Sequence, residues 1–209
     1  DIRGGTSDFS VFENDDGRPR ILANHGIRLG GTDFDHAVSM THAMPCFGLG
    51  GALKREMGAG LLPVPRAYYV DLATWSKIQF LYTPEMRRKV RNMEQLAVEP
   101  KAFARFGDVL ELELGHDIAF AVEAGKIAAN SHSARAAIDL GCVEPGLSVD
   151  ITQPSLSAAL AAYHNPLRAA AQETLRSAGV TQDQIGRVIL VGGSSLMSLV
   201  SDEMQTLFP

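Results

Sequence analysis

The sequence contains only two cysteines and lacks the residue spacing of a metal or serine-hydrolase site. Cys46 and Cys142 lie far apart without paired spacing, so we expect a reduced, cytoplasmic protein rather than a disulfide scaffold. The six histidines form no metal-ligand pair, since even His36 and His42 are six residues apart. The Gly-x-Ser-x-Gly pattern of a nucleophilic serine is also missing.

Long apolar runs and basic blocks are absent as well. No run reaches the roughly 20 residues of a membrane span, and no signal peptide is recognisable. The net charge of −5 argues against nucleic acid or an anionic membrane as the main partner. Small anions remain compatible, because backbone dipoles and a bound metal can outweigh net charge locally. With 209 residues, 45% of them hydrophobic, the chain can form one domain or two subdomains around a sizeable core.

The most informative segment present is the opening, Asp1-Ile2-Arg3-Gly4-Gly5-Thr6-Ser7-Asp8. Glycine N–H groups can approach a phosphate closely, and a threonine hydroxyl can donate to it. Flanking carboxylates can hold a cation beside the phosphate. We therefore expect a chain that begins inside a phosphate site, as a fragment of a larger nucleotide-binding protein.

The first third of the chain predicts a β-hairpin followed by a helix. Residues 9–12 and 20–27 have strand composition, and the turn formers between them favour a hairpin. Gly30-Gly31 then interrupts the chain, and Thr32 or Asp33 can cap a helix that runs to about Met44. Residues 45–82 carry many glycines and prolines among apolar residues. They predict a packed, irregular insertion rather than a phosphate loop.

The middle of the chain predicts helices and a second strand pair. Thr83-Pro84-Glu85 begins a helix that ends near Ala97. One longer helix is predicted from Gly107 or Asp108 to about Asn130, with a buried stripe at four-residue intervals formed by Leu110, Leu114, Ile118 and Val122. Residues 134–140 and 142–151 have the composition of paired strands.

The last third predicts a kinked helix, a strand and a final helix. Residues 152–178 are mostly helical, with a kink expected at Pro166. Thr181 and Gln184 have capping-box spacing. Residues 187–191 form a continuous apolar run, typical of a buried strand such as those of parallel sheets, and Gly192-Gly193 turns the chain into a helix. Such a strand, glycine turn and helix start can form a ligand site, although a tight turn alone explains the pattern equally well.

Three motifs in this order resemble signatures of the heat-shock protein 70 (DnaK-like) family of the actin-like ATPase superfamily. They are residues 1–8, Leu29-Gly30-Gly31-Thr32-Asp33-Phe34-Asp35 and Val188-Ile189-Leu190-Val191-Gly192-Gly193-Ser194-Ser195. Their order and spacing are similar to lobe II of the family's nucleotide-binding domain. The insertion at 45–82 resembles that of a short, divergent bacterial subgroup without the usual peptide-binding domain.

The resemblance implies binding of ATP or ADP with Mg²⁺ and a monovalent cation such as K⁺. It implies that Gly4, Gly5 and Thr6 form the second phosphate loop, with Asp1 and Asp8 near the metal ions and the attacking water. It also implies that Gly30, Gly31 and Asp33 border the ribose, phosphates and cation. The resemblance likewise implies that Gly192, Gly193 and Ser194 pack on the adenosine. The implied catalytic residues are therefore Asp1, Thr6 and Asp8, and the implied metal ligands are Asp1, Asp8 and Asp33.

A fourth element comes from the long helix. Glu123, Lys126, Ile127 and Asn130 share one helical face. By itself this pattern is more typical of a solvated Glu–Lys pair. The family's matching positions embrace the adenosine, so the resemblance implies cofactor contacts for Glu123, Lys126 and Asn130.

Three positions depart from the family pattern. Arg3 stands where the phosphate loop has a glycine, and an arginine is costly if that position requires a positive φ. Its side chain can bind a phosphate, block the site or point to solvent. Ile127 and Leu196 replace the two arginines that sandwich adenine, so cation–π stacking is lost and nucleotide affinity or base preference is in question.

The implied architecture is an α/β, ribonuclease H-like lobe II in two subdomains with the nucleotide between them. Residues 1–28 and 151–209 are expected to form a mixed-sheet core, and residues 29–150 a smaller, mostly helical subdomain. We expect an ATP-binding lobe of a heat-shock-like chaperone, with a protein client or co-chaperone as partner. Lobe I and its catalytic lysine are not in the sequence, so we expect no useful ATP hydrolysis by this chain alone. A sugar-kinase-like or reactivating-factor-like ATPase and a degenerate, non-catalytic module remain alternatives.

Overall fold

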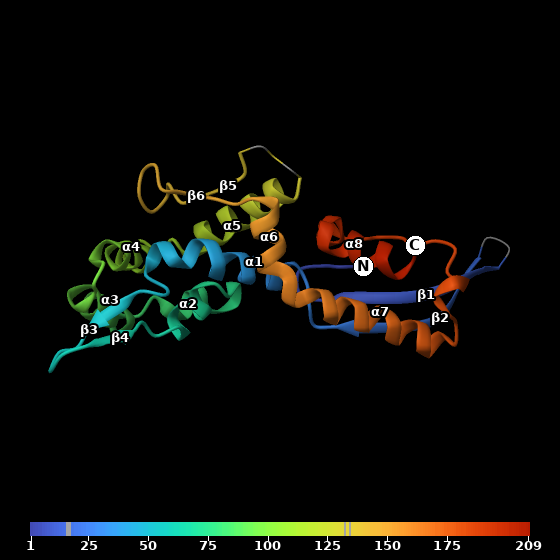
Figure 1. Cartoon of the computed structure of the whole chain (residues 1–209), viewed down its shortest axis with the longest axis horizontal. Coiled ribbons are helices and arrows are strands. Elements are labelled where there is room, and N and C mark those ends of the chain that lie inside the picture. The colour runs from blue at the N-terminus through green and yellow to red at the C-terminus, as the bar shows by residue number, and fades with distance from the viewer. Residues whose placement is uncertain (16–17, 132, 134) are drawn as a thin grey trace. The chain divides into compact units, whose positions relative to one another are not determined.

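In the computed structural model the chain divides into two units, which are described separately (Figure 1). Residues 1–15, 18–131, 133 and 135–209 are described. Unit 1 comprises Asp1–Phe34 and Ser157–Pro209, and unit 2 comprises Asp35–Leu156. Each boundary falls six residues later than the sequence analysis expects. Unit 2 is also the longer of the two, although the helical subdomain was expected to be smaller.

Unit 1 is built on the predicted N-terminal hairpin. Strands β1 (Ser7–Asp15) and β2 (Arg18–Ile27) pair antiparallel, with an irregularity in register between Val11 and Phe12. The turn residues Asp16 and Gly17 lie outside the described part of the chain. Helix α7 (His164–Ala178) packs against this hairpin and against α8 (Ser198–Leu207).

Helix α7 begins where the sequence analysis places a kink. Helix α6 (Gln153–Leu160) ends before a short 3-10 turn at Ala161–Tyr163, and α7 follows directly. Pro166 thus lies in the first turn of α7 rather than at a kink inside one helix. The first-turn N–H groups of a helix have no intrahelical acceptor, so a proline costs little there.

Glu203 links α8 to α7 through a buried carboxylate. Its two oxygens accept hydrogen bonds from Arg168 Nε and Nη2 at 2.9 and 3.1 Å, and His164 Nδ1 lies 2.6 Å from Oε1. The side chain of Glu203 is only 6% exposed. Burial raises the pKa of this carboxyl, but the bonds from Arg168 and His164 outweigh burial and leave the pKa below its ordinary value.

This carboxylate makes the stability of unit 1 sensitive to acid. A carboxyl whose folded-state pKa is lowered stabilises the fold above its unfolded-state pKa and loses that contribution as pH falls through the folded value. We therefore expect unit 1 to be destabilised below about pH 4, and Glu203→Gln to weaken that dependence. Urea unfolding between pH 3 and 7, followed by far-ultraviolet circular dichroism, measures it. An equal pH slope in both proteins would contradict the assignment.

The run 187–191 does not form the buried strand that was predicted. Its four apolar residues, Val188 to Val191, remain 39–57% exposed, and the only backbone hydrogen bond from this run to another described residue joins Ile2 N–H to the Val191 carbonyl at 2.9 Å. A β-branched run needs a neighbouring strand to accept its backbone groups, and β1 pairs only with β2 among the described residues. The mixed sheet expected for this unit is therefore wrong, since each described sheet is a two-stranded antiparallel pair.

Unit 2 is mostly helical and carries two short hairpins. Its helices are α1 (Gly31–Val38, shared with unit 1), a π turn (Ser39–Ala43), a 3-10 helix (Met44–Phe47), α2 (Ala67–Leu72), a 3-10 helix (Trp75–Leu81), α3 (Pro84–Leu96), α4 (Pro100–Glu111) and α5 (Gly115–Asn130). Its hairpins are β3 (Ala52–Lys54) with β4 (Leu61–Pro63), and β5 (Ala137–Asp139) with β6 (Ser148–Asp150). The second hairpin confirms the predicted pair in shorter form, and His132 and Ala134 lie outside the described residues.

The expected insertion at 45–82 is packed, as predicted, but more regular than expected. It contains α2, the β3–β4 hairpin, the whole 3-10 helix Trp75–Leu81 and most of the 3-10 helix Met44–Phe47. Its side chains contribute strongly to the core of unit 2, with Phe47, Tyr69, Leu72, Ile78 and Leu81 all buried. Gly48, at φ 104°, ends the helical segment against the ring of Phe103, so the glycines here form a packed turn.

The single long helix predicted to end at Asn130 is wrong, because the chain forms α4 and α5 with a break between them. Glu113 adopts φ 58° at the break. Arg87 of α3 donates to the Leu110 carbonyl at 3.1 and 3.3 Å and thereby caps the end of α4. Gly115 then donates to Tyr82 Oη at 3.0 Å and packs closely against Ile78. Tertiary contacts override the helix propensity of the intervening leucines and glutamates.

Candidate functional site

The opening segment folds into a tight loop supported by its own ends. The Asp8 N–H donates to the Asp1 carbonyl at 2.8 Å, and the Asp1 backbone nitrogen donates to the Asp8 carbonyl at the same distance. Arg3 N–H donates to the Thr6 carbonyl at 3.0 Å, which closes the tip of the loop. The tip residues Gly4, Gly5 and Thr6 are exposed.

The second motif, residues 29–35, binds the backbone carbonyls of this loop. Gly31 N–H donates to the Arg3 carbonyl at 2.9 Å, and Thr32 donates to the Gly4 carbonyl through both its N–H and its Oγ1 at 2.7 Å. Ser7 is fully buried and donates to the Leu29 carbonyl at 2.7 Å. The carbonyls of the loop therefore face the start of α1, and the hydrogen bonds among described residues leave the N–H groups of Gly4, Gly5 and Thr6 unused.

Helix α1 begins with a hydrogen bond from the backbone just before it to a side chain of its first turn. Gly30 N–H donates to Asp33 Oδ2 at 2.8 Å, and Tyr163 Oη donates to the Asp33 carbonyl at 3.0 Å. The ring of Tyr163 lies 5.4 Å from that of Phe34. A Cβ on Gly30 would lie 2.5 Å from the Arg3 carbonyl oxygen, so only glycine permits this approach. Asp33 therefore supports the helix start, and one of its carboxylate oxygens is already engaged.

The third motif meets the first two in unit 1. Gly192 has φ 93° and ψ 152°, and a Cβ there would overlap the Ile2 carbonyl oxygen and lie 2.8 Å from Asp1 Oδ1. Ser194 Oγ lies 2.5 Å from the position of a Cβ on Gly31. Ser195 Oγ donates to the Gly192 carbonyl at 2.7 Å and fixes the turn. Three glycine-rich segments that are remote in sequence therefore come together around one loop.

Arg3 forms an ion pair that the sequence analysis does not anticipate. Its Nε and Nη2 lie 2.8 and 2.6 Å from Asp1 Oδ2, although its side chain is 72% exposed. Arg3 also avoids the left-handed region, since Glu113 is the only non-glycine residue with positive φ in the described part of the chain. Arg3 therefore carries no positive-φ cost, and it neutralises a carboxylate that was expected to hold a metal.

The loop fits a phosphate better than it fits a divalent cation as it stands. Exposed N–H groups and the Thr6 hydroxyl suit an anion. Asp8 carries a carboxylate at the edge of the loop, but Asp1 is paired with Arg3 and Asp33 with a backbone N–H. Among the described residues, no group of three or more His, Cys, Asp or Glu is arranged to hold a metal ion. A cation at Asp1 would compete with Arg3, which contacts Oδ2 of this carboxylate.

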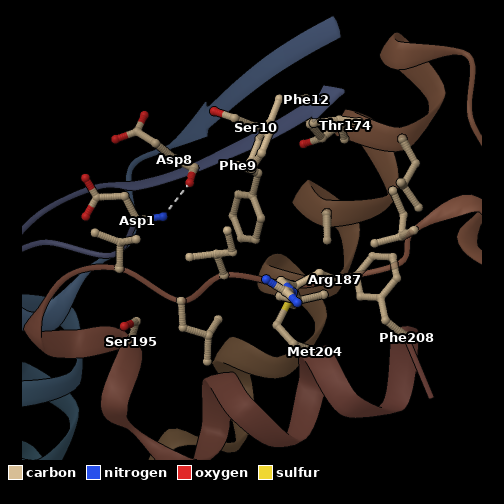
Figure 2. Close-up of a pocket in the computed structure, with 18 of the residues that line it drawn as sticks. Asp1, Asp8, Phe9, Ser10, Phe12, Thr174, Arg187, Ser195, Met204 and Phe208 are labelled. Atoms are coloured by element: carbon tan, nitrogen blue, oxygen red, sulfur yellow. Dashed lines mark hydrogen bonds between the residues drawn. The ribbon is translucent and has the colours of Figure 1, made fainter. Parts of the chain in front are cut away.

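A cavity of about 500 Å³ adjoins the loop within unit 1 (Figure 2). It lies between β1, α7, α8 and residues 185–191, with Asp1, Asp8 and Ser195 at one end and Phe208 at the other. Its middle is largely apolar and includes Phe9. The cavity is the space left where residues 187–191 do not join β1.

The other predicted cofactor residues belong to unit 2. Glu123 and Ile127 are exposed on α5, and Asn130 is half-buried at its end. Lys126 is only 4% exposed, and its Nζ lies 2.7 Å from Asp35 Oδ1. Burial raises the pKa of Asp35 more than Lys126 lowers it, and Glu123 raises it further. Lys126 is therefore committed to a buried ion pair.

Sequence reasoning missed four residues that support these sites. Thr32 and Ser7 bind backbone carbonyls beside the loop, Asp35 pairs with Lys126, and Tyr163 supports α1. Thr32 carries a local signal, since a threonine at a helix start commonly bonds to nearby backbone. Tyr163 carries none, because it is 130 residues away from Asp33 in the chain.

A scan of the chain against known protein families finds no family that matches. In the described part of the chain, no helix is both long enough and apolar enough to cross a membrane. A function for this chain is therefore inferred from the geometry of the loop and from the motifs that surround it.

Proposed function

We propose that this chain is the nucleotide-binding lobe II of an actin-like ATPase similar to the heat-shock protein 70 family, and that it binds the phosphates of ATP or ADP at the loop of Gly4, Gly5 and Thr6. The observation that carries this proposal is the convergence of three glycine-rich segments on one exposed loop with unused N–H groups. Backbone donors of this kind recognise anions without a basic surface, in agreement with the net charge of −5.

The residues of the loop have separate tasks in this proposal. The N–H groups of Gly4 and Gly5 and the Thr6 hydroxyl bind phosphate oxygens. Asp8 holds Mg²⁺ through water or directly, and this cation supplies charge neutralisation at the phosphates. Arg3 modulates the same place, because its pairing with Asp1 Oδ2 competes with a cation for this carboxylate. ATPases of this superfamily also use another phosphate loop and a lysine, both from lobe I, so binding rather than turnover is the activity proposed for this chain.

Isothermal titration of the full chain with ATP, ADP and AMP, with and without Mg²⁺, tests the proposal. We expect tighter binding of ATP and ADP than of AMP, and Thr6→Val should weaken ADP binding about tenfold by removing one hydrogen bond to phosphate. Thr206→Val, which removes an exposed hydroxyl from α8, is the matched control and should leave binding unchanged. Binding of AMP and ADP with equal affinity, or no binding to the folded protein at about 1 mM nucleotide, would refute it.

A non-catalytic module is the second candidate, and one observation favours it. Asp1 is paired with Arg3, and Lys126 with Asp35, so two residues expected to serve the nucleotide are engaged elsewhere. The Arg3→Gly variant separates the two candidates in the same titration. In a nucleotide-binding lobe it should strengthen Mg²⁺-dependent binding by freeing Asp1, whereas a degenerate module should bind neither before nor after the change.

A further inference from the structure

An exposed aromatic cluster lies in unit 2, apart from the residues of the phosphate loop. Trp75 begins a 3-10 helix, and His116 and Phe120 lie on α5. The Trp75 ring centroid is 4.6 Å from that of His116 and 5.1 Å from that of Phe120, and both pairs meet edge to face. Trp75 is 46% exposed and Phe120 59% exposed. The Trp75 cluster, as we call these three residues, is therefore ordered by its own contacts while Trp75 and Phe120 remain exposed and His116 is half-buried.

The cluster continues along one face of α5. His116, Phe120, Glu123 and Ile127 follow one another at intervals of four, three and four residues, which places them on the same side of a helix. Ile127 is 53% exposed, whereas Ile118 and Val122 on the opposite side are buried. The opposite face of α5 thus already packs into the core of unit 2. The outer face combines aromatic and apolar groups in the way that interaction surfaces do.

The charge beside this face is negative. Glu123 lies on this face and is exposed, Asp117 is exposed one residue after His116 on the flank of the helix, and neither forms an ion pair with another described residue. The nearby Lys126 is committed to Asp35. Aromatic faces carry negative quadrupoles, so rings and carboxylates together attract a cation. An apolar partner would gain nothing from the carboxylates, and an anionic one would be repelled.

We propose that the Trp75 cluster docks an arginine-bearing segment of a partner protein. A guanidinium group stacks on the exposed rings of Trp75 and Phe120, and the carboxylate of Glu123, one turn after Phe120, accepts its N–H groups. Arginine fits better than lysine because its planar cation is weakly hydrated and stacks on aromatic rings. The contacts that order the cluster do not involve the loop of unit 1, and because the resemblance also implies a cofactor contact for Glu123, binding is tested in the nucleotide-free protein.

Trp75 is the only tryptophan in the chain, so its fluorescence reports directly on this site. The nucleotide-free protein is titrated with the blocked peptide Gly-Ser-Arg-Ala-Arg-Ser-Gly. Three further peptides carry lysine, neutral citrulline or glutamate in place of arginine. We expect a saturable change with the arginine peptide, binding about threefold or more weaker with lysine, and none with citrulline or glutamate.

Two variants locate the binding and one controls for net charge. Phe120→Ala and Glu123→Gln should each raise the Kd of the arginine peptide at least about fivefold. Asp202→Asn removes an exposed carboxylate from α8 in unit 1 and should leave the Kd unchanged. If Phe120→Ala does not fold, the conservative Glu123→Gln and the citrulline peptide still decide. Equal weakening by Asp202→Asn, equal binding of citrulline, or no saturable change at about 1 mM peptide would overturn the proposal.

Discussion

Replacing Gly192 by alanine is expected to lower the free energy of unfolding by about 3 kcal/mol or more. At φ 93° and ψ 152° this residue occupies a region that only glycine adopts readily. An added Cβ would also overlap the backbone oxygen of Ile2. The N–H of Ile2 donates to the Val191 carbonyl, so Ile2 is fixed where the loop meets the turn. Backbone atoms cannot move aside as a flexible side chain can, so the loop and the turn must separate.

The neighbouring Gly193 is a matched control within the same turn. A methyl group added to Gly193 would meet no atom within 4 Å, and this residue has no positive φ and begins a 3-10 helix. Gly193→Ala should therefore change stability by no more than a few tenths of a kcal/mol. Urea unfolding followed by far-ultraviolet circular dichroism compares the two, and hydrogen exchange in β1 and β2 locates the effect in unit 1. Equal stability of the two variants would show that the loop and the turn do not meet as described.

Replacing Lys126 by methionine is expected to destabilise unit 2 by about 3 kcal/mol near neutral pH. The change leaves the largely buried carboxylate of Asp35 without its cation, 2.7 Å away in the native protein. The pKa of Asp35 is already raised by burial, and losing Lys126 raises it further. A carboxyl whose folded-state pKa is raised lowers the stability of the fold as pH rises from its unfolded-state pKa to its folded-state pKa. The destabilisation caused by Lys126→Met should therefore be smaller in acid than at neutral pH.

Unfolding monitored by Trp75 fluorescence measures this effect, because the tryptophan lies in unit 2. Lys89→Met is the control, since it removes an exposed partner of Glu85 on α3 and should have little effect. Adding Asp35→Asn to Lys126→Met should restore part of the loss by removing the buried charge. A Lys126→Met protein as stable as the Lys89→Met protein would mean that Asp35 is solvated.

Local signals in the sequence predicted many elements well. The Thr83 cap with Pro84 at the first turn begins α3, and Thr83 Oγ1 accepts from Met86 N–H at 3.2 Å. The capping box of Thr181 and Gln184 is present. The N-terminal hairpin also forms where strand composition and turn residues indicated it. These elements depend on contacts within a few residues, so composition and spacing suffice to find them.

Predictions that depended on distant partners were less successful. The apolar run 187–191 has strand composition, yet it lacks the paired neighbour that would bury it. The long helix breaks because Arg87, Ile78 and Tyr82 act on residues more than 20 positions away. Periodicity nevertheless identified most of the buried stripe, since Leu110, Ile118 and Val122 are buried on two helices instead of one.

The sequence by itself determined which segments carry glycine, threonine and carboxylate in patterns suited to phosphate, because those properties belong to the residue types. Only the tertiary structure decided that the three segments meet, through close approaches at Gly30, Gly31 and Gly192. It also decided how the charges are used, with Arg3 on Asp1 and Lys126 on Asp35. Ion pairing depends on distance and burial in space, and neither can be derived from spacing along the chain.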